Sequence, residues 1–477
     1  MPEQPTSSSF DADLRAAQDL HLQGRLGEAE AAYAALLNRD FDHPGLLYLL
    51  GTLSLQQGRH GLAAHLLRAA VAQDPLRAEA HANLGTAYFR AQRHEEALRS
   101  YAQAHRLDPR HAGVLANLAA LLVNEGVPER ALEYAQAALA LEPGCAPAHW
   151  NAALALLELA RWPEGWREFE WGFATGDRLR RNYSAGQDTP DWDGAPGRTV
   201  VVQGEMGIGD EVLFASCLPD LVRVCRQVIF DCHPRLEPLF RRSFPGVTLH
   251  GTRKDEYIAW SAQLAIDARV AIGSLPGRFR LSAGDFPGQA YLRADPRRVD
   301  HYRARLAALP GGGPAVAVAW AGGTPTTRAD LRTVPLALWS GLLAEPARFV
   351  SLQYTPDAAP QAAAQGIAHW QEAVDDLDEM AALIAACDVV ISVCQSAVHL
   401  AGALGVPCWC LVPSKPAWRY GVSGESMPWY ASVRLFRQGA GEAWAAVLGR
   451  VGVELSRLCG TWSGQGPLGA AAPRPCT

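Results

Sequence analysis

A 34-residue period runs through the first third of the chain and constrains its fold more than any other feature of the sequence. When the chain is aligned with itself at this shift, small residues coincide with small residues and acids with acids. The small residues are Ala29, Ala63, Ala97 and Ala131, and the acids are Asp40, Asp74, Asp108 and Glu142, the last three followed by proline. This pattern is the signature of the tetratricopeptide repeat. It predicts a solenoid of helical pairs over residues 11–178, after a disordered N-terminus at 1–10.

The physical basis of the repeat is simple. Alanine allows the two helices of a unit to approach closely, and the acid-proline pair ends a helix because proline disfavours helical backbone at the residue before it. No unit buries its apolar face alone, so neighbouring units stack. We expect four pairs up to residue 162 and a last helix over 163–173 that caps the solenoid or docks it on the next domain. Such a solenoid binds a protein segment in its groove; a spacer or dimerisation module is the alternative.

Composition excludes several classes of function. The 477 residues predict two or three domains, and the net charge of -6 with no long basic run argues against a nucleic-acid partner. The N-terminus lacks the pattern of a secretory signal, and no run of 18 apolar residues could span a membrane. Ten cysteines without a CxxC pair favour reduced thiols in a cytoplasmic protein.

After residue 195 the pattern changes to strands alternating with helices, which predicts parallel sheets. In the first half we expect strands at 199–203, 228–232 and 247–249, with 262–267 as a possible fourth; in the second half we expect them at 315–320, 348–354, 387–393 and 406–412. The predicted fold is therefore an α-solenoid followed by two Rossmann-like halves, 195–310 and 311–450, that face each other across a cleft. The Gly/Pro-rich tail, 460–477, is expected to be disordered.

Two loops of the second half carry groups suited to an anion. The stretch AGGTPTTRADLRTVPL offers hydroxyls and guanidiniums for a diphosphate, from Thr326, Thr327, Arg328 and Arg332. The stretch SVCQSAVHLAGALGVP runs from strand to helix with Ser396 as the expected N-cap. The free amides of Ala397, Val398 and His399 and the helix dipole would then favour a phosphate. Ordinary turns with solvated arginines, and a buried helix histidine, are the alternatives.

The stretch VVVQGEMGIGDEVLFASCL, residues 200–218, raises a different question. A buried strand that runs into glycines and a helix start has the shape of an anion site. Asp210 and Glu211, however, place negative charge where a phosphate would lie. The loop is therefore expected to do something other than hold a nucleotide.

Several stretches together resemble a known family. GEMGIGDEVLFASCLP, VAVAWAGG, RFVSLQ, AALIAACDVVISVCQSAVHLAGALGVPCW and MPWYASVRLFRQ are similar to the C-terminal domain of bacterial tetratricopeptide-repeat glycosyltransferases. That domain resembles the ADP-heptose:lipopolysaccharide heptosyltransferases, which have the two-Rossmann GT-B fold. The resemblance covers residues 163–440 and implies an inverting transferase that uses a nucleotide-sugar. Some members resemble flagellin glycosyltransferases, whose repeats hold the protein acceptor.

The resemblance also suggests roles for residues. It places Asp210 on the acceptor side as the general base, with a helix N-cap as the alternative role and Glu211 in reserve. It places Thr326, Thr327 and Arg332 toward the phosphates of the sugar donor, and Ser396, Ala397 and His399 under them. The nucleobase would lie near the acidic run Asp375, Asp376, Asp378 and Glu379, which a solvated helix start also explains. Loop 413–430 is expected at the rim of the cleft, with Trp429 packed in an aromatic cluster.

One departure from the family stands out, because Cys394-Gln395 replaces the usual Asp-Thr. This change implies either a different sugar donor or lost activity. Three functions are then open: a metal-independent glycosyltransferase acting on a protein, a repeat scaffold with a degenerate transferase domain, and a transferase acting on a glycolipid. The first needs no cofactor other than its nucleotide-sugar substrate.

Overall fold

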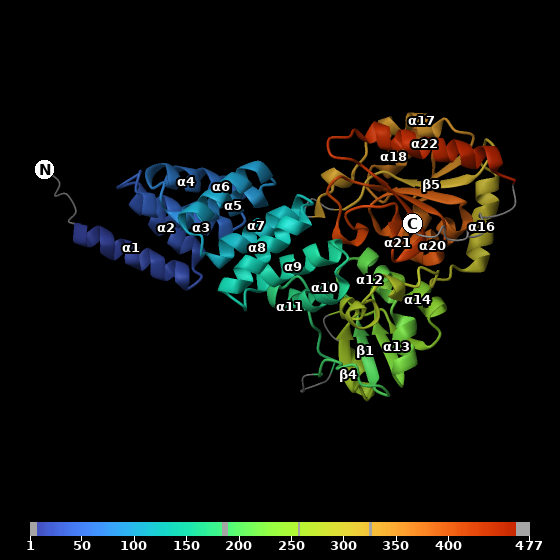
Figure 1. Ribbon diagram of the computed structural model, residues 1–477, viewed down its shortest axis with the longest axis horizontal. Helices are drawn as coiled ribbons and strands as arrows, with labels where there is room; N and C mark the ends of the chain where they lie inside the picture. Colours follow the sequence, from blue (N-terminus) through green and yellow to red (C-terminus); the bar gives the residue numbers. More distant parts are fainter. Residues whose placement is uncertain (1–6, 184–188, 256–257, 324–326, 464–477) are drawn as a thin grey trace. The chain divides into compact units, whose positions relative to one another are not determined.

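The structure, a computed structural model, describes residues 7–183, 189–255, 258–323 and 327–463. The chain divides into two compact units, Met1–Ala155 and Leu156–Thr477 (Figure 1). The first unit is helical, as the period predicts, and the second contains parallel sheets. None of the helices within these described ranges has the length and apolar character needed to cross a bilayer.

The helices of the first unit pair in chain order, α1 with α2 through to α7 with α8. Their bounds are α1 Ser7–Leu22, α2 Leu26–Leu37, α3 Pro44–Gln56, α4 His60–Gln73, α5 Ala78–Arg90, α6 His94–Leu107, α7 Ala112–Asn124 and α8 Pro128–Leu141. The alanines that define the repeat, from Ala29 to Ala131, are all fully buried. Helix α1 begins at Ser7, so the prediction of disorder over 1–10 is wrong for residues 7–10; residues 1–6 lie outside the described ranges.

The turn inside each helical pair has one residue in the left-handed region, and these residues also recur every 34 positions. They are Gly24, Gly58, Gln92, Gly126 and Ala160, with φ between 57° and 75°. The last of them joins α9 (Ala146–Glu158) to α10 (Trp162–Phe169), so a fifth hairpin of repeat geometry follows the four predicted pairs. The second unit begins at Leu156, inside α9, whereas the repeat geometry continues through α10, so the solenoid limit predicted at 178 stays a prediction.

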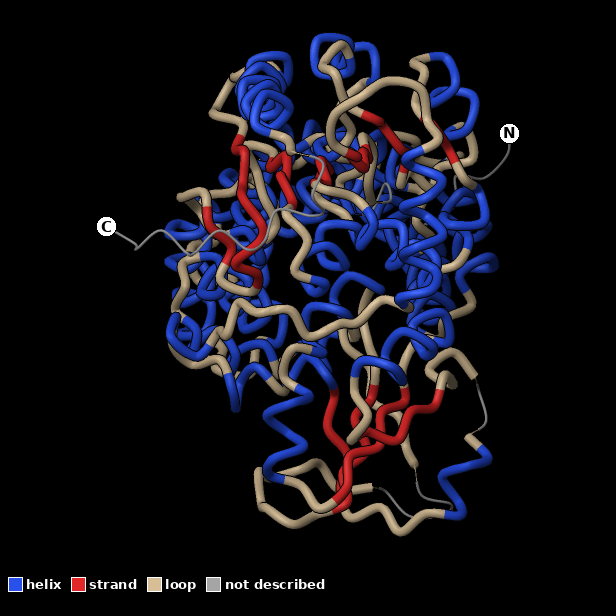
Figure 2. The backbone as a smooth tube through the Cα atoms, turned by 90° about the vertical axis from the view of Figure 1, so that its right-hand side faces the viewer, coloured by secondary structure: helices blue, strands red, loops and turns tan. Residues whose placement is uncertain are grey.

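The first half of the second unit contains a four-stranded parallel sheet in the order β3-β2-β1-β4. Figure 2 shows these strands at the bottom of the view. The bounds are β1 Thr199–Gln203, β2 Gln227–Asp231, β3 Val247–His250 and β4 Ala268–Ala271, with helices α11 Gly172–Thr175, α12 Ile208–Ala215, α13 Leu218–Val224, α14 Glu237–Ser243 and α15 Pro276–Phe279. The fourth strand lies beyond the predicted 262–267, because residues 259–263 form a 3₁₀ turn.

The second half contains a seven-stranded sheet in the order β10-β11-β9-β8-β5-β6-β7, parallel except for β10. Its parallel strands thus follow the 3-2-1-4-5-6 order of doubly wound sheets, which places the crossover point between β5 and β8. The strands are β5 Ala315–Ala319, β6 Arg348–Ser351, β7 Ala368–His369, β8 Val389–Val393, β9 Cys408–Val412, β10 Ser426–Met427 and β11 Tyr430–Arg437. The helices are α16 Pro296–Ala307, α17 Ser340–Leu343, α18 Ala358–Ala364, α19 Gln371–Asp375, α20 Leu377–Ala386, α21 Ser396–Leu404 and α22 Trp444–Thr461.

The predicted limits of this half need correction at both ends. The amides of Tyr291 and Leu292 donate to the carbonyl of Ala403, and α16 packs on α20, so the chain enters the second half near residue 290 rather than at 311. At the other end α22 continues past the predicted limit of 450, through the start of the tail predicted as disordered, to Thr461. Residues 464–477 lie outside the described ranges.

An aromatic cluster ties α10 to both halves. Its rings are Trp162, Trp166, Phe169, Phe214, Phe286, Trp418 and Trp429, with neighbouring centroids 4.8–6.5 Å apart. The indole of Trp166 also donates to the carbonyl of Arg280 at 2.9 Å. The cluster therefore packs α10 on both α/β halves of the second unit and confirms the packing of Trp429. Whether the helix at 163–173 caps the solenoid or docks it on the next domain stays a prediction.

The nine cysteines of the described residues are unbonded thiols, seven of them buried. This agrees with the predicted reduced thiols. The cytoplasmic location itself stays a prediction.

Gly85 tests the close approach of paired helices. A Cβ atom there would lie 2.5 Å from Cδ1 of Tyr101, whose ring is buried, so the ring must move. Overpacking costs about 1–3 kcal/mol, which exceeds the gain of about 1 kcal/mol in helix propensity. We expect Gly85→Ala to lower the free energy of unfolding by about 1 kcal/mol in urea titrations followed by circular dichroism. Gly61→Ala, where a Cβ meets nothing within 4 Å, is the control and should not destabilise.

Candidate functional site

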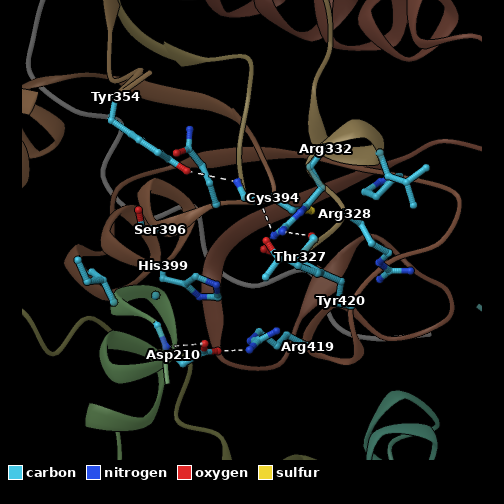
Figure 3. A pocket seen from close by; sticks show the side chains of 18 of the residues that line it. Asp210, Thr327, Arg328, Arg332, Tyr354, Cys394, Ser396, His399, Arg419 and Tyr420 are labelled. Carbon is cyan, nitrogen blue, oxygen red and sulfur yellow. Dashed lines mark hydrogen bonds and ion pairs between the residues drawn. The ribbon is translucent and has the colours of Figure 1, made fainter. Parts of the chain in front are cut away.

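A cleft of about 760 Å³ lies between the two halves of the second unit (Figure 3). One wall is the start of α12, which follows β1. The other is formed by the loops that follow β5 and β8 and by residues 413–420 after β9. Ligands of doubly wound sheets bind beyond the carboxyl ends of the strands, at the crossover point, and the loops after β5 and β8 lie there.

Among the charged side chains that line the cleft, basic ones outnumber acidic ones. Five basic side chains line it, Arg235, Arg328, Arg332, Lys415 and Arg419, against the two carboxylates of Asp210 and Asp375. This excess of positive charge contrasts with the net charge of -6 of the whole chain. The cleft is therefore suited to an anionic ligand.

Asp210 lies in the first turn of α12 and lines the cleft. Its Oδ2 accepts a hydrogen bond from the amide of Gly207 at 3.2 Å. Gly207, three residues earlier, is the N-cap of α12, so the alternative prediction that Asp210 is the N-cap is wrong, although its side chain does bond to the N-cap amide. Its Oδ1 forms an ion pair with Arg419 from the opposite wall, marked by a dashed line in Figure 3. These contacts leave the catalytic role of Asp210 a prediction.

Glu211 does not reach the cleft. Its carboxylate is fully buried, accepts from the amide of His233 at 2.7 Å and pairs with Arg253. Burial, opposed by the charge of Arg253, raises the pKa of Glu211 to about 7. The reserve role suggested for Glu211 is therefore wrong, because the carboxylate is committed to the interior of the first half.

Arg332 holds the loop that follows β5 in place through hydrogen bonds to the backbone. Arg332 donates to the backbone carbonyls of Thr327 and Cys394, the second at 3.4 Å. Gly323 has a φ of 85° and a Cβ there would collide with the Arg332 guanidinium, so this position requires glycine. The amide of Gly323 also lies 3.3 Å from the hydroxyl of Tyr354, to which it donates. Thr327 and Arg332 thus lie together in the cleft, as predicted, whereas Thr326 lies outside the described residues.

The start of α21 differs from the prediction by one residue. Gln395, in extended backbone, is the N-cap, and Ser396 is the first helical residue. The amide of Val398 donates to the carbonyl of Gln395 at 3.1 Å, so it is not free for a ligand. Ser396 lines the cleft, and the side chain of Ala397 is buried behind it.

His399 faces α12 across the cleft floor. A Cβ on Gly209 would lie 2.9 Å from Cδ2 of His399, so glycine allows the two helix starts to approach. The imidazole is buried and its Nδ1 lies 3.4 Å from the hydroxyl of Tyr430. Burial, and then the charge of Arg419, lowers the pKa of His399 to about 3. The ring is therefore neutral. It is buried, as one alternative predicts, and it also lines the cleft, while its role toward a phosphate stays a prediction.

The unusual Cys394-Gln395 pair lies at the carboxyl end of β8. The Cys394 thiol donates to the carbonyl of Leu411 at 3.5 Å and lies 3.7 Å from the sulfur of Cys410. Gln395 is 7% exposed, and its side-chain nitrogen, Nε2, has no acceptor among the described residues. A buried donor without a partner costs free energy, so Gln395 is available to a ligand in the cleft.

The acidic run at 375–379 is only partly explained by a solvated helix start. Asp376 caps α20 by accepting from the amides of Asp378 and Glu379, at 2.7 and 3.2 Å. Asp378 is buried and pairs with Arg242 of α14, so the description as solvated is wrong for this residue. Only Asp375 lines the cleft.

Sequence reasoning missed Arg235, which lies just after the end of β2. Its guanidinium crosses to the second half and donates to the carbonyl of Asp375 at 2.9 Å. Its place beyond a parallel strand was a usable signal. Lys415 and Arg419, by contrast, line the cleft as expected for the loop at 413–430. No group of three or more His, Cys, Asp or Glu side chains in the described part of the chain is placed to hold a metal ion.

Comparison with known proteins identifies relatives. The tetratricopeptide repeat model matches residues 48–112. Protein FlbA of Caulobacter vibrioides is 33% identical over 425 residues, which span 83% of this chain and 70% of FlbA. Among solved structures, MamA is similar with a TM-score of 0.31 and 22% identity, covering 34% of this chain and 94% of MamA. PilF of Pseudomonas aeruginosa is similar with a TM-score of 0.34 and 18% identity, covering 46% of this chain and 87% of PilF.

His399 makes a prediction about pH. Its folded pKa of about 3 lies below the ordinary value near 6.5, so its contribution to stability is present above pH 6.5 and is lost as pH falls toward 3. Between pH 7 and pH 5 this loss approaches about 2 kcal/mol. We expect His399→Gln to lose less stability than the wild type over that interval in urea titrations. The exposed His301→Gln is the control, and an equal loss in both variants would show that His399 is not the group responsible.

Proposed function

The chain belongs to the family of the protein FlbA, and we propose that it is a glycosyltransferase that moves a sugar from a nucleotide-sugar to an acceptor. The observation that carries the proposal is the basic cleft between two parallel sheets, with Asp210 on the wall opposite the arginines. Two doubly wound halves facing each other across such a cleft fit the GT-B arrangement, which we propose for this unit.

The sugar donor would occupy the wall formed by the second half. Arg328, Arg332 and Lys415 supply positive charge for its phosphates, and the start of α21 adds a favourable dipole. Apolar side chains of 374–380 line the same cleft and offer a surface for the base: Val374, Leu377 and Met380. The position agrees with the nucleobase site that the family resemblance implies.

Asp210 would act on the acceptor. As the acceptor oxygen bonds to the anomeric carbon, the bond from that carbon to the phosphate oxygen breaks, and the hydroxyl proton passes to the carboxylate. Arg332 and the helix start stabilise the negative charge that develops on the departing nucleotide. Attack from the wall opposite the leaving group inverts the configuration of the sugar.

The acceptor is proposed to be a protein held by the repeats. Stacked tetratricopeptide repeats form extended concave surfaces of the kind used for binding polypeptides. The family resemblance suggests flagellin as one acceptor of this type.

One observation favours the second candidate, a scaffold with a degenerate transferase unit. The Cys394 thiol replaces the carboxylate of related transferases and is turned toward Leu411 and Cys410 rather than offering a charge to a ligand. A scaffold would retain the fold and the groove without binding a nucleotide.

Calorimetry on the full chain with a panel of nucleotides and nucleotide-sugars separates the two candidates. A transferase should bind one nucleotide class, and Arg332→Ala should weaken that binding at least about tenfold, because a charge-assisted hydrogen bond is lost. Asp210→Asn should not weaken nucleotide binding but should reduce sugar transfer by about 10²–10⁴-fold.

Arg434→Ala is the matched control, because Arg434 pairs with Glu425 and Glu454 and does not line the cleft. Its nucleotide affinity should equal that of the wild type. A folded protein that binds none of the panel would instead support the scaffold.

A further inference from the structure

The proposed general base is not free in this structure. One oxygen of Asp210 accepts from the amide of Gly207, and the other pairs with Arg419. Asp210 belongs to α12 of the first half, and Arg419 to the turn at Trp418–Tyr420 in the second half, so the pair crosses the cleft (Figure 3). Both carboxylate oxygens of Asp210 thus already have partners in this arrangement. A general base needs to be released before it can act.

Arg419 is incompletely satisfied by this pairing. Its Nε is buried and has no acceptor among the described residues, while the guanidinium carbon lies 4.9 Å from the ring centre of Trp418. Four further cations line the same cleft, Arg235, Arg328, Arg332 and Lys415. An anion entering the cleft would offer Arg419 oxygen acceptors and would relieve the crowding of positive charge.

The backbone around Arg419 is held in place while its side chain reaches into the cleft. Trp418 is anchored in the aromatic cluster, where its ring stacks on Phe214 with centroids 6.3 Å apart. Arg437 donates to the carbonyls of Tyr420 and Gly421 and fixes the chain on the other side. A change of partner by Arg419 thus needs only a rotation of the side chain.

We propose that Arg419 is a ligand of the sugar donor's anionic group and that it exchanges Asp210 for this group when the donor binds. The exchange frees the carboxylate to take the acceptor's proton, so the base becomes active only when the donor is in place. This inference rests on the proposed transferase function. Arg419 then has two partners in turn, and Asp210 competes with the donor for the same guanidinium.

Competition makes a prediction that does not depend on catalysis. Asp210→Asn removes the competing charge but keeps an oxygen for the amide of Gly207, so it should bind the nucleotide at least about fivefold more tightly than the wild type. Arg419→Ala should bind it at least about tenfold more weakly. The gain from Asp210→Asn should disappear in the double variant, since the guanidinium for which Asp210 competes is absent.

The measurement is calorimetric titration of the four proteins with nucleoside mono- and diphosphates at one salt concentration, after thermal unfolding has shown that each variant is folded. Asp375→Asn is the matched control, because Asp375 also lines the cleft but its side chain accepts from Gln371. Any gain in nucleotide affinity from Asp375→Asn reflects the loss of general repulsion between a carboxylate and the anionic nucleotide. Such a gain should persist when Arg419→Ala is added.

The outcomes are distinct. A gain from Asp210→Asn that persists in the Arg419→Ala background shows repulsion rather than competition and overturns the exchange. Unchanged or weaker binding by Asp210→Asn overturns it as well, while the binding itself leaves the proposed function standing. If neither the wild type nor any variant binds a nucleotide, the proposed function fails and the exchange fails with it.

Discussion

The packing of aromatic rings around Trp166 is the interaction on which the second unit depends. Trp166 lies on α10. The centroid of its ring lies 6.3 Å from that of Phe214 in the first half and 5.6 Å from that of Trp418 in the second half. One helix that precedes both sheets in the sequence therefore serves as a common support for both. Each aromatic pair adds about 0.5–1.5 kcal/mol beyond the burial of its surface, and the rings are rigid, so they set distances as well as stability.

This cluster also positions the chemistry of the cleft. Phe214 and Asp210 lie one turn apart on α12, and Trp418 directly precedes Arg419. Fixing the two rings against each other therefore fixes the starts of the two side chains that meet across the cleft. The glycines at the cleft follow from the same closeness, because a Cβ at Gly209 would contact His399 of the facing helix. The packing of the rings behind the cleft therefore also determines how closely the residues inside the cleft approach each other.

The sequence predicted those features that depend on local pattern. The 34-residue period identified the helical pairs because each repeat makes nearly the same contacts, and the apolar runs identified most strands. The prediction of a strand at 262–267 was wrong because the true strand, Ala268–Ala271, is short and fully buried and has no alternation to locate it. Gln395 rather than Ser396 is the N-cap of α21, because the backbone is extended at Gln395 and helical from Ser396, and two neighbouring polar residues do not show in the sequence where that change falls. The pairings of Arg235, Asp378 and Arg419 join segments more than 130 residues apart, and no local pattern encodes them.

The contacts between the halves divide into two kinds with different consequences. Ion pairs such as Arg242 with Asp378 and Arg419 with Asp210 lose hydration when they form, and this cost offsets most of their attraction. These ion pairs therefore set how the two halves are aligned more than they add to the free energy of unfolding. An anion that enters the cleft can take the place of the carboxylate in such a pair. The buried rings have no such competitor, because a ligand in the cleft cannot solvate them. The exchange proposed for Arg419 would therefore change one ion pair across the cleft, while the aromatic cluster continues to hold the two halves together.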